Sequence, residues 1–375
     1  MTALTSSHPP GIRLSDAQRL AWLRLIRSDS VGPVTFRELI NHFGSAAAAL
    51  DAVPDLARRG GRPIRVAPLQ DAERELERIA EIGARLIAIG EPDYPPWLTA
   101  VDGAPPLIAV RGWSETVTRP SVAVVGSRNA SIAGRKFAMQ IARDLGEAGL
   151  AVVSGLARGI DAAAHGAALA TGTIAVFAGG LDRPYPAENV DLAERIVDDG
   201  GAHLTEMPMG WEPRARDFPR RNRIISGLAL GVVVVEAAHR SGTLITARSA
   251  ADQGRLVFAV PGSPLDPRAG GTNRLIKDGA ILVTGVGDIL AEIEPMLGRE
   301  PTAAAVAERE APAPAMDAND DDRSVILEAL GKTPVELDEI VRFTGLKPAV
   351  VHLVLLELDL AGRIERHAGQ RVSLV

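Results

Sequence analysis

The sequence predicts an α/β fold whose centre is a doubly wound parallel sheet, with a small helical module before it and a further small domain after it. Between residues 121 and 285, short apolar runs alternate with helical patterns. Glycine-bearing loops join these runs to the helices, and a segment rich in alanine, proline and acid, 299–321, sets off the end of the chain. Because strands buried on both faces read as continuous apolar runs, this alternation is typical of a parallel sheet covered by helices.

The sequence pattern of residues 1–70 predicts the small helical module. Ser15 is a suitable N-cap for an amphipathic helix that ends near Ser28, and the Gly-Pro pair at 32–33 precedes a second helical pattern. Helix-hairpin-helix and SAM-like domains carry such glycine-bearing turns, whose amides can contact phosphate. Plain helix packing explains the same residues, so both interpretations stay open.

Residues 71–298 predict an extended Rossmann-like core. A helix and a strand over 71–90 lead into a proline-rich edge that ends in GAPPLIAV. Helices are expected to alternate with the strands that follow, and the expected strands are SVAVVG, LAVVSG, TIAVFAGG, HLTEM, GVVVVEA, RLVFAVPG and AILVTG. Since ligands of such sheets bind beyond the carboxyl ends of the strands, the loops GSR, SGLARG, AGGLD, EAAHRSG and VPGSP are the candidate binding segments.

The end of the chain predicts a linker and a winged helix. Residues 299–321 contain almost nothing large to bury, which indicates a linker. Residues 322–375 show three helical patterns and two short strands, the order of a winged helix, with 7 basic against 8 acidic residues. The expected recognition helix, 347–360, holds one lysine and ends in Glu357 and Asp359, so DNA phosphate would be repelled there. We therefore favour a protein-contact or regulatory role over duplex DNA binding.

Composition narrows the class of protein. The 375 residues include no cysteine, which excludes disulfides, thiolate nucleophiles and cysteine metal sites. No apolar run approaches the length of about 18 residues that spans a bilayer, so a cytoplasmic protein without membrane contact is expected. The formal net charge of −6 argues against a surface coated in nonspecific DNA-binding charge. Any site for a polyanion must therefore be local.

Residue types that bind phosphate gather in three of the candidate loops. Gly126-Ser127-Arg128 follows the first core strand, where a dinucleotide-binding protein would show G-x-G-x-x-G, and its arginine replaces the close-approach glycine. Five of the ten residues 214–223 are arginine. Ser241-Gly242-Thr243 would open a later helix and offer amides and hydroxyls to a phosphate. These loops favour a polyanion over a neutral metabolite.

The order of the motifs resembles that of one known family. GSRNAS, SGLARGIDAAAHGAAL, YPAEN, FPRRNRIISG, EAAHRSGTLITA and GTNRLIKDGA occur as in the DNA-processing protein A family (DprA, also called Smf). The resemblance covers about 160 central residues. It implies a non-enzymatic protein that binds and protects single-stranded DNA and helps load the RecA recombinase on it during natural transformation. It also implies a homodimer and no cofactor or metal.

The predicted DNA-binding residues come from the three loops. They are Gly126, Ser127, Arg128, Arg216, Phe218, Arg220, Arg221, Asn222, Arg223, Ser241, Gly242 and Thr243. Residues three apart share a helix face, so Arg220 and Arg223 are expected on one wall, with Arg221 facing elsewhere. Phe218 is the best candidate for stacking on a base, with core packing as the alternative.

Three further residues are expected to support this site. Asp161 and His165 lie four apart on the helix after SGLARG, on one face and within reach of each other, and we expect a structural hydrogen bond at the sheet edge in preference to an acid–base pair. Glu236 ends the GVVVVE strand and is expected to pair with an arginine of the site.

Other classes of protein remain as alternatives. One is a nucleoside-phosphate hydrolase of the lysine-decarboxylase-like type, and another is a scaffold that binds free nucleotides as signals. The hydrolases carry a catalytic glutamate two residues after a PGGxGT loop, whereas residues 244–247 are Leu-Ile-Thr-Ala. The GKT at 331–333 imitates a Walker A loop, but Ile326 occupies the position of its first glycine.

Overall fold

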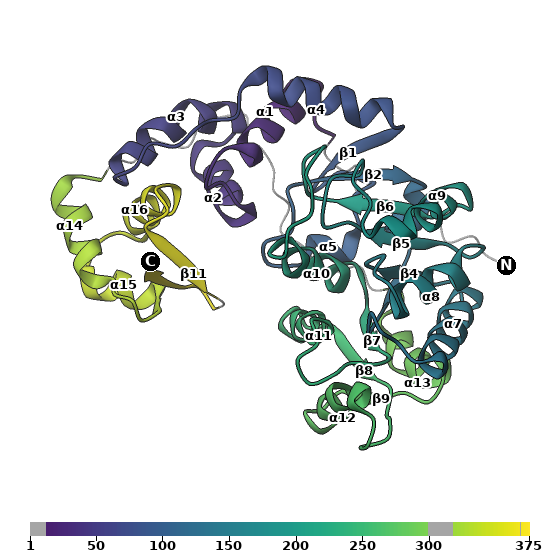
Figure 1. Cartoon of the computed structure of the whole chain (residues 1–375). Helices are drawn as coiled ribbons and strands as arrows, with labels where there is room; N and C mark the ends of the chain where they lie inside the picture. Colours follow the sequence, from purple (N-terminus) through teal and green to yellow (C-terminus); the bar gives the residue numbers. More distant parts are fainter. Residues whose placement is uncertain (1–12, 299–317, 368) are drawn as a thin grey trace. The chain divides into compact units, whose positions relative to one another are not determined.

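The computed structural model describes residues 13–298 and 318–375, apart from residue 368, and these residues form two compact units (Figure 1). The first, which we call the sheet unit, contains residues 75–298. The second, the helical unit, combines residues 14–74 with 318–375. No helix within the described residues is long and apolar enough to cross a membrane.

A nine-stranded sheet forms the centre of the sheet unit, in the order β1-β2-β6-β5-β4-β3-β7-β8-β9. All neighbours from β6 to β9 in this order are parallel, whereas β1 and β2 at one edge run antiparallel. The strands are β1 Ala84–Ala88, β2 Leu107–Gly112, β3 Ser121–Val125, β4 Ala151–Ser154, β5 Thr173–Val176, β6 Ala202–Thr205, β7 Gly231–Val234, β8 Leu256–Ala259 and β9 Ile281–Leu282. The predicted doubly wound sheet is therefore confirmed, with an antiparallel edge added.

Helices cover both faces of this sheet. Apolar side chains of α7, α8 and α13 join those of β3, β4, β7 and β8 in one buried core, and Figure 1 shows α10 and α11 on the opposite face. The α-helices are α4 Leu69–Glu81, which begins in the helical unit, α5 Pro96–Thr99, α6 Ser114–Thr118, α7 Ile132–Glu147, α8 Ile160–Ala168, α9 Val190–Asp198, α10 Asp217–Leu228, α11 Thr243–Asp252, α12 Gly270–Lys277 and α13 Val286–Ile293.

The strand order reverses direction at β3. From β3 the chain builds β4, β5 and β6 outward on one side, then returns to place β7, β8 and β9 on the other. The loops after β3 and β7 therefore lead away from each other at the carboxyl ends of two adjacent strands. Such a switch point leaves a crevice beside the sheet.

The proline-rich edge expected from GAPPLIAV is an inner strand instead. Its residues 107–112 form β2, which pairs with β1 on one side and with β6 on the other. Pro105 and Pro106 stop just before the strand, so neither removes a donor from the ladder. The outermost strand at this edge of the sheet is β1.

The helical unit contains three N-terminal helices and a winged helix. Ser15 caps α1 as predicted, through a reciprocal pair of bonds with Gln18. Trp22 and Phe36 pack edge to face with ring centroids 4.9 Å apart in its core. The elements are α1 Asp16–Arg27, α2 Pro33–Phe43, α3 Ala46–Arg59, α14 Asp320–Ala329, β10 Val335–Glu336, α15 Leu337–Thr344, α16 Pro348–Leu360, β11 Ile364–His367 and β12 Arg371–Leu374.

The acidic end of the predicted linker belongs to a helix. Residues 299–317 lie outside the described residues, but Asp320 and Asp321 form the first turn of α14. Asn319 caps this helix by accepting a hydrogen bond from the amide of Asp322 at 2.8 Å. Carboxylates in a first turn face the positive end of the helix dipole, which explains why these residues continue as a helix.

Two buried histidines of the sheet unit are held neutral. The hydroxyl of Thr173 donates to the carbonyl of Val152, so it accepts the proton of His165 Nδ1 at 2.7 Å, and His165 Nε2 has no partner. His203 Nε2 donates to the carbonyl of Ala193 at 2.8 Å. Burial lowers the pKa of His165 to about 3 and the pKa of His203 to about 4. A proton on either ring would leave a buried charge without a partner.

We predict that these histidines make the fold lose stability in mild acid. The unfolded chain protonates both near pH 6.5 while the folded chain does not, so the free energy of unfolding falls as pH drops from about 6.5 to 4. The slope is up to about 1.4 kcal/mol per pH unit for each histidine. Urea unfolding across this range measures it. His203→Gln should flatten the slope, whereas His239→Gln, at an exposed position, should leave it unchanged. Equal slopes in wild type and His203→Gln would contradict this account.

Candidate nucleic-acid interface

A crevice of about 640 Å³ opens at the switch point, at the carboxyl ends of β3, β4 and β7. Three segments line most of it: the loop 126–129 after β3, four residues of α10 (Phe218, Pro219, Arg221 and Asn222), and residues 240–243, which lead into α11. A smaller cavity of about 220 Å³ shares Arg128, Phe218 and Arg221 with the crevice. The three loops predicted from the sequence therefore meet at one place.

The loop after β3 brings the backbone close to the helix that follows β4. A side chain at Gly126 would place its Cβ 2.6 Å from the side chain of Ile160, so only glycine fits. The hydroxyl of Ser127 accepts a bond from the amide of Asn129 at 3.2 Å, which tightens the turn. Arg128 then extends into solvent over the crevice, where it is exposed.

The loop before α11 is tied to the loop after β3. Thr243 Oγ1 donates to the carbonyl of Gly126 at 3.0 Å, and Ser241 Oγ lies 3.0 Å from Thr243 Oγ1. A Cβ at Gly242 would meet no atom within 4 Å. Protein packing therefore does not require glycine at 242, and the space beside it is open at the amino end of α11.

Phe218 is the aromatic centre of the site. Its ring is partly buried and lies edge to face with Tyr185, with centroids 5.6 Å apart. The guanidinium carbon of Arg128 lies 5.3 Å from the ring centroid, and that of Arg221 lies 5.9 Å from it. Both distances fall in the range of cation–π attraction. The ring and the two cations therefore form one cluster.

Arg221 is the buried cation of this cluster. Its Nη1 donates to the carbonyls of Gly155 and Val176, each at 2.6 Å, at the ends of β4 and β5. Burial lowers the pKa of Arg221 to about 10, and the attraction of Asp161 opposes that shift. The group is thus charged at neutral pH. A Cβ at Gly155 would lie 2.6 Å from the guanidinium carbon, so glycine makes room for it.

Arg220 and Arg223 share one face of α10, as predicted, but that face is not the crevice. Arg220 Nε and Arg223 Nη2 bond to the two oxygens of buried Glu206 at 2.9 and 2.5 Å. We expected these two arginines to line the site and Arg221 to face elsewhere. In the structure Arg221 lines the crevice, and Arg220 and Arg223 face Glu206. The sequence did not reveal the reason, because Glu206 lies at the end of β6 and meets α10 only in the folded chain.

Of the two remaining predicted residues in the arginine-rich segment, one lines the crevice and the other lies on the exposed surface. Asn222 lines the crevice with Arg221. Arg216 is exposed at the N-cap of α10 and is not among the lining residues.

Asp161 and His165 both make structural hydrogen bonds at the edge of the sheet, as expected, but not to each other. The Asp161 carboxylate accepts the amides of Gly155 and Ala157 at 3.1 and 3.4 Å, because the loop after β4 folds back over the first turn of α8. His165, one turn later, faces β5 and bonds to Thr173. Burial raises the pKa of Asp161, while Arg221 and the amides act in the opposite direction. Asp161 thus shapes the loop beneath the crevice.

Glu236 supports the site through its bonds to the start of α7, and its hydrogen bonds go to Ser131 and not to an arginine of the crevice. Its carboxylate accepts bonds from the amide and the hydroxyl of Ser131, at 3.0 and 2.5 Å. Ser131 is the N-cap of α7, and a Cβ at Gly134 would lie 2.6 Å from Glu236 Oε1. The strand end of β7 thereby fixes the start of the helix that follows the loop after β3.

Sequence reasoning missed several residues that line these cavities, and three of them carry a charge or an aromatic ring suited to nucleic acid. Arg240 is exposed on the crevice, and Arg158 and Tyr185 line the smaller cavity. Each lies inside a motif already recognised, HRSGT, SGLARG or YPAEN. A tyrosine in a chain with only two was the available signal.

Comparison with known families gives a consistent result. A family model described as DNA recombination-mediator protein A matches residues 85–294. A DprA-like N-terminal HHH domain matches residues 16–77, and a DprA winged helix domain matches residues 310–370.

Individual relatives extend over most of the chain. The chain is 37% identical over 367 residues to Protein Smf of Escherichia coli, covering 94% of this chain and 95% of that protein. It is 48% identical over 205 residues to DNA processing protein DprA of Streptococcus pneumoniae, covering 54% of this chain and 72% of that protein.

Solved structures share the fold. The X-ray structure of DNA processing protein A from Streptococcus pneumoniae superposes with a TM-score of 0.61 at 35% identity, covering 75% of this chain and 99% of that one. DNA processing protein A from Helicobacter pylori has a TM-score of 0.53 at 24% identity and covers 58% of this chain and 98% of that one. At that identity the second comparison shows the fold alone.

We predict that Glu206 stabilises the sheet unit through its two arginines. Glu206→Gln keeps the shape but turns an amide toward one guanidinium and removes the counter-charge of both. The free energy of unfolding should fall by about 1.5–3 kcal/mol, measured by urea denaturation. Glu212→Gln is the control, because Glu212 is 75% exposed in its pair with Arg183 and such pairs contribute little. Equal losses in the two variants would contradict the prediction.

Proposed function

Because the chain belongs to the DNA recombination-mediator protein A family, we propose that it binds single-stranded DNA in the crevice and helps load a RecA-type recombinase on that strand. The role would serve natural transformation and other recombination, with the protein acting as a homodimer without chemistry of its own. The observation that carries the proposal is the cluster of Arg128, Phe218 and Arg221.

The cluster matches the chemistry of a single strand. Nonspecific binding of single strands combines positive charge along the backbone with aromatic faces on which bases stack. Arg128 and Arg240 are exposed for phosphate, and Phe218 with Tyr185 offers aromatic surface in a chain with 3% aromatic residues. Arg221 adds a positive charge at the floor of the crevice, where its Nη1 is held by hydrogen bonds to two carbonyls. The Helicobacter pylori relative is described as binding single-stranded DNA.

The charge distribution favours local binding over a coated surface. Glu206 compensates Arg220 and Arg223, and Arg158 pairs with Glu188 at 3.3 Å. The arginine-rich segment 214–223 and the loop that carries Arg158 therefore contribute fewer uncompensated charges than their composition indicates. A strand held by a few phosphates and one or two stacked bases fits this arrangement.

A catalytic role has less support. Asp161 is the one acidic residue that lines the crevice in the described part of the chain, and backbone amides already engage its carboxylate. The described residues hold no group of three or more acidic or histidine side chains able to bind a metal ion. We favour binding over the hydrolase alternative for these reasons.

The decisive experiment compares single-stranded and duplex oligonucleotides of equal length by fluorescence anisotropy at several salt concentrations. Tighter binding of the single strand is expected. Loading is tested by adding the protein to RecA recombinase on DNA coated with single-strand-binding protein and following strand exchange. A protein that binds both DNA forms equally and leaves strand exchange unchanged would refute the proposal.

We predict that Arg128→Ala weakens binding of the single strand and flattens its dependence on salt. Loss of one phosphate contact should change the slope of log K against log salt by about 0.7. Salt titration measures it, and unfolding curves should match wild type because Arg128 is exposed. Arg143→Ala, at an exposed position of α7 outside the crevice, is the control. An unchanged slope in Arg128→Ala would remove this arginine from the interface.

We predict that Phe218→Leu weakens binding without changing the salt slope. Leucine keeps apolar bulk but has no aromatic face, so about 1–3 kcal/mol of binding free energy should be lost while the number of released counterions stays the same. Anisotropy and urea unfolding are measured on the same preparation. Wild-type affinity in the leucine variant would make Phe218 a packing residue.

A further inference from the structure

The second half of the helix expected to read DNA in a winged helix is buried on all sides, whereas Pro348, Ala349 and His352 in its first half are exposed. In α16, the six consecutive residues 353–358 are each at most 2% exposed. Six consecutive positions cover more than one full turn, so no face of this part of the helix reaches solvent. A winged helix by itself buries one face of such a helix. The opposite face must have another partner.

That partner is the N-terminal helical module. Within the helical unit, α16 packs against both α2 and α3. At the end of α3, a Cβ on Gly60 would lie 2.6 Å from the carbonyl carbon of Glu357, 2.9 Å from the Cβ of Ala361, and closer still to the Glu357 carbonyl oxygen. The backbones of α3 and α16 therefore touch, and only the missing side chain of Gly60 permits the approach.

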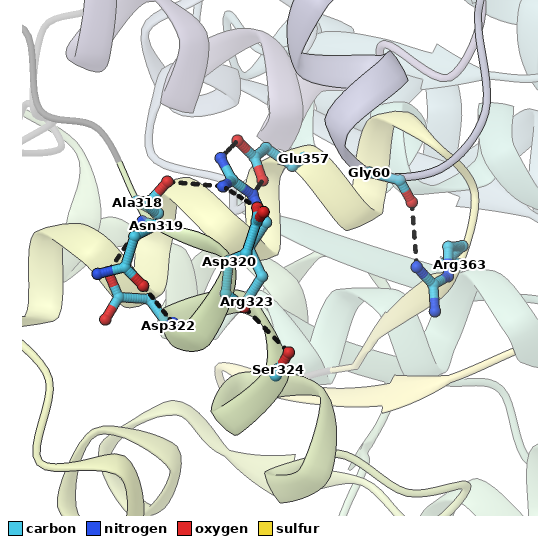
Figure 2. Close-up of polar contacts among 9 residues, drawn as sticks. All are labelled: Gly60, Ala318, Asn319, Asp320, Asp322, Arg323, Ser324, Glu357 and Arg363. Atoms are coloured by element: carbon cyan, nitrogen blue, oxygen red, sulfur yellow. Dashed lines mark hydrogen bonds and ion pairs between the residues drawn. The ribbon is translucent and has the colours of Figure 1, made fainter.

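Figure 2 shows two polar contacts, one that holds α16 and one made by the residues that follow it. Arg323 of α14 binds both carboxylate oxygens of Glu357 at 2.8 Å, so the buried charge at Glu357 has a partner inside the winged helix. On the other side, Arg363 Nη1 donates to the carbonyl of Gly60 at 3.2 Å. That second bond joins the winged helix to the N-terminal module.

A polar network completes the contact. Arg366 of β11 binds both oxygens of Glu38 in α2, at 2.7 and 2.5 Å, and its Nε donates to Asp359 at 2.9 Å. Asp359 also accepts the hydroxyl of Thr35 at 3.0 Å, in the first turn of α2. Arg366 thus bridges the acidic end of α16, which would repel DNA phosphate, to Glu38 of the module.

We propose that α16 is an internal docking helix: the winged helix and the N-terminal module of one chain clamp together, and residues 353–358 of the helix with which a free winged helix reads duplex DNA are covered. The carboxylate of Asp359 holds the first turn of α2, the turn that begins with Gly32-Pro33. Duplex DNA would have to open this clamp before either part could bind it through these surfaces. This inference is independent of the single-strand site in the sheet unit.

A single thiol can report on the clamp, since the chain contains no cysteine. Thr35 is 4% exposed, and Asp359 of the winged helix is its side-chain partner. In Thr35→Cys, a nearly isosteric change, we expect slow reaction with a maleimide. Fast labelling in this otherwise unaltered chain would overturn the proposal.

Gly60→Ala should open the clamp and speed labelling at least tenfold. Gly60 has φ −66° and ψ −10°, an ordinary helical conformation that alanine adopts, so the obstacle is the contact with α16. Gly331→Ala in the winged helix is the matched control, because a Cβ there meets only one atom, at 4.0 Å. Equal labelling rates in the two variants would overturn the proposal. Arg366→Met tests the same contact through the polar network, and it too should speed labelling.

Protein dilution and added duplex DNA test what covers α16. If α16 docks within its own chain, the labelling rate of Thr35→Cys does not depend on protein concentration, whereas docking on a second copy would make it rise on dilution and overturn the intrachain clamp. Excess duplex DNA should leave the rate unchanged. Acceleration by duplex DNA would mean that DNA displaces the module from α16, which would restore α16 as a DNA-reading helix.

Discussion

Arg221 is the residue around which the floor of the crevice is organised. Its guanidinium bonds to carbonyls at the ends of β4 and β5, lies near Asp161, and supports Phe218 from within the protein. A buried cation without such partners would be strongly unfavourable. The carbonyls, the carboxylate and the glycine at 155 therefore form one set, and together they hold the start of α10 against the sheet at the switch point.

Compensation of charge explains how an acidic protein can carry a site for a polyanion. Glu206 takes up two arginines of α10, so the positive charge that faces the crevice comes from Arg128, Arg221 and Arg240. A fully uncompensated run would repel itself and destabilise the start of α10. The pairing keeps the helix in place and restricts the field to one edge of the sheet.

The helical unit applies the same principle to a protein contact. Acidic residues of α16 and α2 are bridged by arginines, and residues 353–358 of an apolar helix are covered on every side. Its burial explains why residues 347–360 are so rich in leucine and valine and contain only one basic residue. The composition of 347–360 suits a helix enclosed by protein.

The sequence by itself determined the sheet, the helix caps and the three loops of the site, because apolar periodicity, Ser15 and the glycine motifs are local signals. The sequence also predicted that Gly126, Arg128, Phe218 and Thr243 lie at one edge of the sheet, because the carboxyl ends of parallel strands meet there. Only the tertiary structure decided which arginines face the crevice, because Glu206 meets α10 from another strand. The same holds for Asp161, Glu236 and the cover of α16, whose partners are distant in sequence and become neighbours only when the chain has folded.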